Sequence, residues 1–461
     1  MSTGIPTEPE KQELAFITSN PLHKLDRSSR KLVRSHVMRG KNRRKKAAEA
    51  TIVRSWINQG STNGDDTTLI SSFPAGQHVP PPIQIWSDLP MTHFAYQMPS
   101  YAPELLFNFF TVIGQAVYPI ELCVVDLQNS IWIEYLAQDQ LYCHMTLWVA
   151  QAYFDSIRGH GISTIQSRHG QETLVKLQQR LPDTQLAISN VTILVVGCLA
   201  VATALVEIEK ETACRHMLGL NRMVQLRGGI TAFRGNPHVQ LKICRADLIT
   251  AMLLGNKPKF FNDDISWDSF ITKKHMNIQE MPPGQVLCLH PKLTNVWNDL
   301  REFTKSANLA TQTGQKIPFG LYYETLISVQ YRLLLFGNET GAHGDAIHAG
   351  MLGFATSIFL QMKGFSMRFE RLSSQLKKTI LGMNDTTVDS SMAVKLWLLF
   401  IARLVISQGG DDFWLETEMR NTIKTLELHC WPSAKHRLMG FLWIGFLHDD
   451  SGKKVFEDIL R

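Results

Sequence analysis

The residues most able to do chemistry in this sequence are basic side chains gathered near its start. Twelve of the 31 residues from Lys24 to Arg54 are Lys or Arg, against two acids, which gives the stretch a formal charge of +10. The whole chain carries +6, so the other 430 residues sum to −4. A local block of this kind can neutralise nucleic-acid phosphates or present a short basic epitope to a nuclear import receptor.

Spacing places several of these cations together. Asp26 can cap a helix that begins near Arg27, and residues at i, i+3, i+4 and i+7 of that helix share one face. After Gly40, the run KNRRKK adds five more charges. The residues predicted to bind an import receptor or duplex DNA are therefore Arg27, Arg30, Lys31, Arg34, Arg39, Lys41, Arg43, Arg44, Lys45 and Lys46.

Three interpretations of this block stay open: a nuclear import signal, a phosphate-binding surface, or a solvated run of charge with neither role. The first two are compatible with each other. No aromatic residue lies among the basic ones before Trp56, so base stacking on single strands is not supported. Any contact with DNA is expected to be electrostatic and steeply dependent on salt.

Two other polar strings have a simpler explanation than chemistry. Residues 409–413, Gly-Gly-Asp-Asp-Phe, resemble the GGDEF string of cyclic-dinucleotide synthases, but they lie between two helical runs, where glycines end one helix and an aspartate caps the next. His448-Asp449-Asp450 is expected to be a loop at a helix end. The sequence contains no nucleophile elbow, P-loop, zinc-protease or dinucleotide motif. We therefore predict no enzyme, no cofactor and no metal site.

Composition predicts a large globular body. The chain has 461 residues, 44% of them hydrophobic, which suffices for one large core or two medium ones. Its seven cysteines are dispersed without a C-x-x-C pair, as expected of small buried side chains in a reducing compartment. The apolar run Val191–Val206 is shorter than a bilayer crossing needs, so we predict a buried helix there, no membrane span and no signal peptide.

The elements that must position these residues are helices. We predict a disordered N-terminus over 1–26, a basic helical arm over 27–57, a flexible linker over 58–82 and an all-helical domain over 83–461. The fold class is all-α: packed antiparallel helices, with an irregular crossing at 257–291. Apolar residues at helical period predict helices over 102–117, 122–136, 139–158, 166–181, 186–208, 211–228, 236–254, 293–308, 319–337, 344–363, 371–382, 392–407, 412–428, 433–447 and 453–460.

One helix and its surroundings carry a family resemblance. The stretch HMLGLNRMVQLRGGI, His216–Ile230, is followed by RADLITAMLLGNKPKF, Arg245–Phe260, and together they resemble the fungal-specific transcription factor domain. The upstream FITSNPLHKLDRSSRKLVRSHVMRGKNRRKK resembles the N-terminal signature of one subgroup. The resemblance implies a helical regulatory domain in the nucleus that binds a partner, a second copy or an effector. His216 and Arg227 could line an effector cavity, or only pack and neutralise helix C-terminal carbonyls.

This chain departs from the family where DNA is read. A zinc binuclear cluster needs six closely spaced thiolates, whereas the first cysteine here is Cys123. We therefore expect a nuclear regulator of transcription that lacks the zinc cluster and whose basic arm serves import and phosphate contact. The alternative is a nuclear scaffold or cofactor that does not bind DNA. Expected partners are an import receptor, duplex DNA through its phosphates, and a homodimer or transcriptional partner protein.

Overall fold

The computed structural model describes residues 94, 97–117, 119, 122–123, 131–207, 210–261, 265–269, 289–337, 342–362, 367–383, 389–406 and 413–461. These residues all belong to one compact unit, residues 69–461. The predicted disordered N-terminus, basic arm and linker lie outside the described residues, and their boundaries stay predictions.

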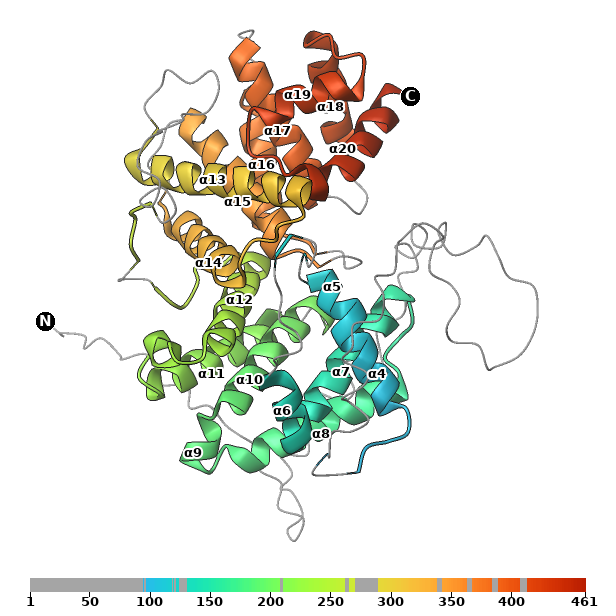
Figure 1. Cartoon of the computed structure of the whole chain (residues 1–461), viewed down its shortest axis with the longest axis vertical. Helices are drawn as coiled ribbons and strands as arrows, with labels where there is room; N and C mark the ends of the chain where they lie inside the picture. The colour runs from blue at the N-terminus through green and yellow to red at the C-terminus, as the bar shows by residue number, and fades with distance from the viewer. Residues whose placement is uncertain are drawn as a thin grey trace, which may run out of the picture. The chain divides into compact units, whose positions relative to one another are not determined.

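The described part of the chain is built from helices (Figure 1). Its strand-like pairing is a single parallel bridge between Cys123 and Ile317, in which the Ile317 N–H donates to Leu122 O over 2.9 Å. This arrangement confirms the all-α prediction.

The first half of the unit, which we call the N-terminal group, surrounds a mostly apolar helix. That helix, α10, packs on α7, α11 and α12, and ten of its thirteen residues are buried. The predicted buried helix at 191–206 is thus confirmed. The elements of this group are α4 (Ala102–Asn108), π-helix η1 (Phe109–Ile113), α5 (Gly114–Val117), α6 (Ile131–Gln138), α7 (Gln140–Ile157), α8 (Thr164–Arg180), α9 (Thr184–Ala187), α10 (Asn190–Ala202), π-helix η2 (Thr203–Glu207), α11 (Lys210–Leu226), 3-10 helix η3 (Ile230–Phe233) and α12 (Pro237–Leu254).

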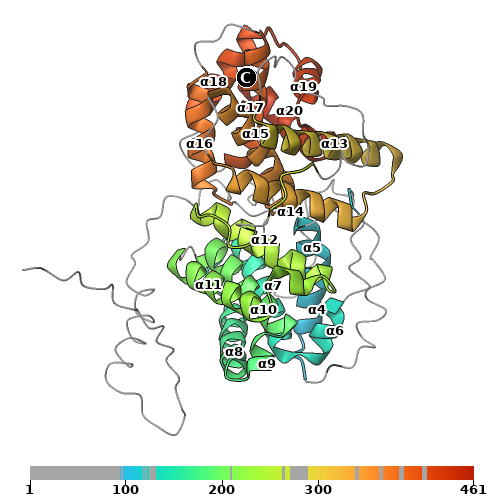
Figure 2. The ribbon, with the colours of Figure 1, turned by 90° about the vertical axis from the view of Figure 1, so that its left-hand side faces the viewer.

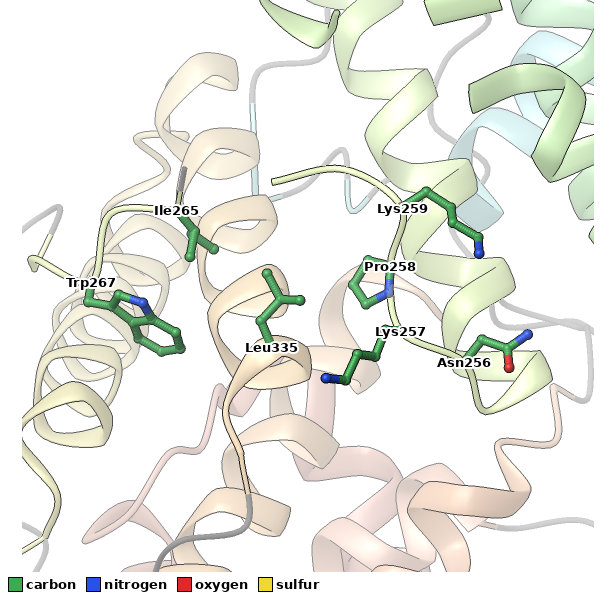
Figure 3. A pocket seen from close by; sticks show the side chains of 7 residues that line it. All are labelled: Asn256, Lys257, Pro258, Lys259, Ile265, Trp267 and Leu335. Atoms are coloured by element: carbon green, nitrogen blue, oxygen red, sulfur yellow. The ribbon is translucent and has the colours of Figure 1, made fainter. Parts of the chain in front are cut away.

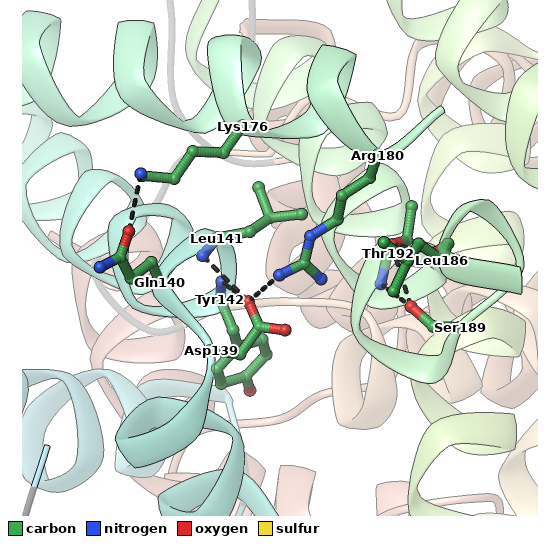
Figure 4. A network of polar contacts seen from close by, with 9 residues as sticks. All are labelled: Asp139, Gln140, Leu141, Tyr142, Lys176, Arg180, Leu186, Ser189 and Thr192. Atoms are coloured by element: carbon green, nitrogen blue, oxygen red, sulfur yellow. Dashed lines mark hydrogen bonds and ion pairs between the residues drawn. The ribbon is translucent and has the colours of Figure 1, made fainter. Parts of the chain in front are cut away.

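A capping carboxylate ties two of these helices together (Figure 4). Asp139 precedes α7, and its Oδ1 accepts the backbone N–H groups of Leu141 at 2.9 Å and Tyr142 at 3.3 Å. The same oxygen accepts from Arg180 at the end of α8 over 2.7 Å. Because the first N–H groups of a helix lack intrahelical partners, this contact both starts α7 and holds the end of α8 against it.

The second half, which we call the C-terminal group, buries three tryptophans between closely packed helices. Trp297, Trp397 and Trp443 are each at most 1% exposed. On α15, Gly350 lets the ring of Trp397 approach so closely that a Cβ there would lie 2.3 Å from Trp397 Cζ3. The elements are α13 (Pro291–Thr313), α14 (Phe319–Leu335), α15 (Ala342–Phe359), α16 (Glu370–Leu381), α17 (Asp389–Ile406), α18 (Phe413–Thr425), α19 (Trp431–Met439) and α20 (Gly445–Leu460).

Helix α12 joins the two groups. It packs on α10 and α11 of the first group and on α14 and α16 of the second, and it lies beside α14 in both views (Figures 1 and 2). The segment after α12 was predicted to be irregular, and its described residues, 256–261, 265–269 and 289–290, contain no helix.

Several predicted helices end differently in the structure. The predicted helix 186–208 is broken, because Ser189 caps α10 by accepting the Thr192 N–H while the Thr192 hydroxyl donates to Leu186 O (Figure 4). The predicted helix 102–117 contains the π-helical turn η1. In the predicted helix 122–136, residues 122–123 are not helical and α6 begins at Ile131.

The prediction for the last two helices was wrong. Helix α19 ends before Gly440, and α20 begins at Gly445, so His448-Asp449-Asp450 lies within a helix and not in a loop. His448 is 3% exposed. Its Nδ1 accepts the Ile444 N–H over 3.2 Å, so its Nε2 carries the proton and donates to Ser357 Oγ, also over 3.2 Å. The side chain thereby satisfies a backbone N–H at the start of α20.

The cysteines follow the predicted pattern only in part. Cys123, Cys143 and Cys244 are buried, Cys198 and Cys214 are half-buried, and Cys430 is exposed before α19; all six are free thiols. Among the described residues, no helix combines the length and the apolar run that crossing a bilayer requires.

Candidate functional site

The ten basic residues predicted to bind an import receptor or DNA, Arg27 to Lys46, lie outside the described residues. Their roles therefore stay predictions. The same holds for residues 409–412 of the Gly-Gly-Asp-Asp-Phe string, after which α18 begins at Phe413.

The structure gives Arg227 one of its two expected roles, but at another helix. Its Nη1 donates to Ile188 O, at the C-cap of α9, over 3.0 Å and to Asn190 Oδ1 of α10 over 2.6 Å, so it neutralises a C-terminal carbonyl of α9 and not one of its own helix. Gly228 and Gly229, with φ of 101° and 84°, end α11 as predicted. His216 is half-buried, and burial lowers its pKa. Neither His216 nor Arg227 lines the cavity beside the C-terminus of α12.

A cavity of about 640 Å³ opens beside the C-terminus of α12. One side is the segment Asn256–Lys259, which follows α12; the opposite side consists of Ile265, Trp267 and Leu335 (Figure 3). In the figure, Lys257 is directed toward Leu335, whereas Lys259 is directed away from Trp267. The cavity thus has an apolar, aromatic wall facing a basic one.

The basic wall is held by a buried carboxylate. Asp247 of α12 is 1% exposed, and its two oxygens accept the Lys259 N–H over 2.8 and 2.9 Å. Its Oδ2 also accepts the Phe260 N–H over 3.1 Å and the Tyr331 hydroxyl over 2.9 Å. Two backbone donors on one side chain fix the path of the chain after α12, including Phe261 with its φ of 59°.

The apolar wall is held by a buried ion pair. Arg332 Nη2 of α14 lies 2.6 Å from Asp299 Oδ2 of α13, and both side chains are 0% exposed. The Ser269 hydroxyl donates to Asp299 Oδ1 over 2.6 Å, and Arg332 Nη1 donates to Asp268 O over 3.3 Å. The segment that carries Trp267 is therefore attached to the centre of the C-terminal group.

The charges around the cavity are mostly positive among the described residues. Lys257 and Lys259 are exposed, and the ammonium of Lys292 lies 4.5 Å from the ring centroid of Trp267. Lys257 forms no ion pair with any described residue. Burial raises the pKa of Asp247 to about 6, against the opposing effect of the N–H groups of Lys259 and Phe260. Asp247 is therefore mainly ionised at pH 7.

This arrangement has the chemistry to bind a ligand. An ammonium beside an aromatic face can hold an anion attached to an apolar body. Within the described ranges, no three His, Cys, Asp or Glu side chains come together in a way that could hold a metal ion.

Sequence reasoning missed this site, although the sequence carried a signal for it. Asp247, Lys257 and Lys259 all belong to the stretch Arg245–Phe260 that carries the family resemblance. Asp247 stands in an apolar helix, and Arg332 stands in the run YRLLLF. A charge within an apolar helical run predicts a buried partner, because an unpaired buried charge is costly.

Comparisons with known proteins do not identify a family for this chain. No family model, curated protein or solved structure matches this chain. The resemblance to the fungal-specific transcription factor domain therefore stays a prediction from the sequence.

Proposed function

We propose that this protein is a nuclear regulator of transcription without catalytic activity. In this proposal the basic arm provides nuclear import and contacts DNA phosphates, and the helical body binds a partner protein, a second copy or an effector. The observation that carries the proposal is the placement of twelve Lys or Arg and only two acids between Lys24 and Arg54, in a chain whose other residues are net acidic.

Two features of the body support a regulatory role. It is a set of packed helices around a mostly apolar core, and its cavity has binding chemistry, with the ammonium of Lys257 opposite an aromatic wall. Helix α12 contributes to both groups and leads directly into the basic wall of the cavity. A ligand there would contact residues from both halves of the unit, which is a physical route for an effector to act on the body.

The import role is tested by neutralising four cations of the arm. The variant Arg43→Gln, Arg44→Gln, Lys45→Gln, Lys46→Gln, fused to a fluorescent protein, is expected to leave the nucleus, because the receptor epitope is charge-dependent. The matched control removes the same charge from exposed positions of the body, namely Arg168, Arg222, Lys316 and Lys424. Nuclear localisation of the arm variant would contradict the import role.

Phosphate contact is tested separately by titrating duplex DNA at several salt concentrations. If all four neutralised residues meet phosphates, the slope of log affinity against log salt should fall in magnitude by up to about 3.6, at about 0.9 per contact. The body control should keep the slope of the original protein. If the protein binds no duplex at 50 mM salt but still depends on the arm for import, the scaffold alternative replaces the DNA-contacting role.

A further inference from the structure

The cavity beside α12 brings an apolar wall and a lysine together. Its volume of about 640 Å³ lies within the range of about 300 to 1,000 Å³ typical of small-molecule pockets. The indole of Trp267 and the side chains of Ile265 and Leu335 form the apolar wall, and Lys257 is directed toward Leu335 from the other side (Figure 3).

The two walls are positioned by side chains that do not themselves line the cavity. The Asp247 carboxylate holds the backbone N–H groups of Lys259 and Phe260, and the Asp299–Arg332 pair holds Ser269 and Asp268. Asn295 adds a bond from its Nδ2 to Trp267 O over 3.1 Å. Because these contacts are present before any ligand, the backbone of both walls is already in place, which favours affinity.

We propose that this cavity binds a small organic anion, with its carboxylate or phosphate on the ammonium of Lys257 and its aromatic or apolar body against Trp267. The role of this ligand as an effector rests on the proposed regulatory function, whereas its binding can be measured independently of that function. Lys292, whose ammonium lies over the ring of Trp267, adds positive potential there. Asp263 and Asp264 follow in the sequence and lie outside the described residues.

The test uses the full-length protein and four probes: benzoate, phenyl phosphate, inorganic phosphate and the neutral benzyl alcohol. Binding is followed by isothermal titration calorimetry and ligand-observed NMR up to about 10 mM, the range in which fragment-sized ligands saturate. We expect one-to-one binding of benzoate or phenyl phosphate and at least about tenfold weaker binding of benzyl alcohol, since the ammonium contact needs a charge. The tighter of the two aromatic anions distinguishes a carboxylate effector from a phosphate one.

Variants locate the site. Lys257→Gln should weaken binding of the aromatic anion about fivefold to tenfold, while Lys259→Gln should have a smaller effect because its side chain is directed away from the wall. The matched control is Lys316→Gln, an exposed lysine in the loop before α14, which should bind as the original protein does. Trp267→Leu should weaken the aromatic anions but not inorganic phosphate.

Four results would overturn the inference: no saturable binding of either aromatic anion, equal affinity for benzyl alcohol, unchanged binding by Lys257→Gln, or phosphate alone binding as tightly as phenyl phosphate. Lys257→Gln should remain nuclear, so a failure of ligand binding and a failure of the proposed function are separate observations.

Discussion

The N-terminal and C-terminal groups bury charge in two different ways. In the N-terminal group, buried carboxylates accept hydrogen bonds from uncharged donors: Asp247 from two backbone N–H groups and a tyrosine, and Asp155 from the Gln151 amide and the Ser163 N–H. In the C-terminal group, buried charges form ion pairs, Arg332 with Asp299 and Lys395 with Glu418.

The difference shows that a buried charge can have two structural roles, fixing a loop or linking two helices. A carboxylate that accepts backbone N–H groups fixes the course of a loop, and its net charge stays inside the protein, where burial disfavours it. An ion pair cancels its own charge and links two helices side chain to side chain, but it becomes costly when one partner is removed. The basic wall of the cavity is held by the Asp247 carboxylate and the apolar wall by the Asp299–Arg332 ion pair. The two walls can therefore be tested separately.

The largest expected effect comes from breaking the ion pair of the C-terminal group. Arg332→Leu should lower the free energy of unfolding by about 3 to 5 kcal/mol, because Asp299 stays buried without its partner. The double variant Arg332→Leu, Asp299→Leu should recover much of this loss. Urea unfolding measures both, and a loss below about 1 kcal/mol for the single variant would contradict the importance of the pair.

The next effect is a pair of opposite pH dependences. Burial lowers the pKa of His448 to about 4 from its ordinary 6.5, so its contribution to stability is complete above pH 6.5 and is lost, by up to about 3 kcal/mol, as pH falls to 4. The pKa of Asp247 is raised to about 6 from 3.8, so stability falls by up to about 3 kcal/mol as pH rises from 4 to 6.

Variants separate these two groups from the remaining titrations of the protein. The stability difference between the original protein and His448→Gln should shrink as pH falls from 6.5 to 4, because the original loses the histidine's contribution. The free energy of unfolding of the original protein minus that of Asp247→Asn should increase over the same fall in pH, because the original gains stability as Asp247 is protonated. Unfolding by urea at pH 4, 5, 6 and 7 measures both, and two differences that change in the same direction would refute the assignment.

A smaller effect compares two helical glycines. Gly350→Ala in the C-terminal group should lower the free energy of unfolding by about 1 to 3 kcal/mol, since the new Cβ would meet the buried Trp397 ring. Gly197→Ala in α10 of the N-terminal group meets its nearest neighbour, Ala246 Cβ, at 3.6 Å and should raise it by about 0.5 to 1 kcal/mol through helix propensity. Thermal unfolding of both variants tests the contrast; equal effects would show that helix packing is alike in the two groups.

The smallest effect is expected at the rim of the N-terminal group. Arg180→Gln removes the ion pair with Asp139, whose side chains are 21% and 18% exposed, and should cost only about 0.2 to 1 kcal/mol. Asp139 keeps its bonds to the N–H groups of α7 in this variant. A cost as large as that of Arg332→Leu would remove the distinction between rim and buried ion pairs.

Much of the fold could be predicted because helices leave a periodic trace in the sequence. The apolar run of α10 predicted a buried helix, and Gly228-Gly229 predicted the end of α11, since both signals are local. The breaks at Ser189 and Gly440 were missed because apolar residues continue through them, so hydrophobic period alone could not show where backbone bonding changes.

The candidate site was less predictable. The basic arm was evident from composition, but the cavity depends on Asp247 meeting residues 12 and 13 positions later, and on Asp299 meeting Arg332 from another helix. Sequence shows that such charges stand in apolar runs without showing which partner each one meets. The predicted residues and the cavity residues are therefore two different sets.

The sequence by itself determined the all-helical class, the apolar faces that must be buried and the concentration of positive charge near the start, because each follows from residues close together in the chain. Only the tertiary structure decided that α12 joins the two groups and that Lys257 and Trp267 line one cavity. Contacts between distant residues depend on how helices pack, and many packings satisfy the same apolar period.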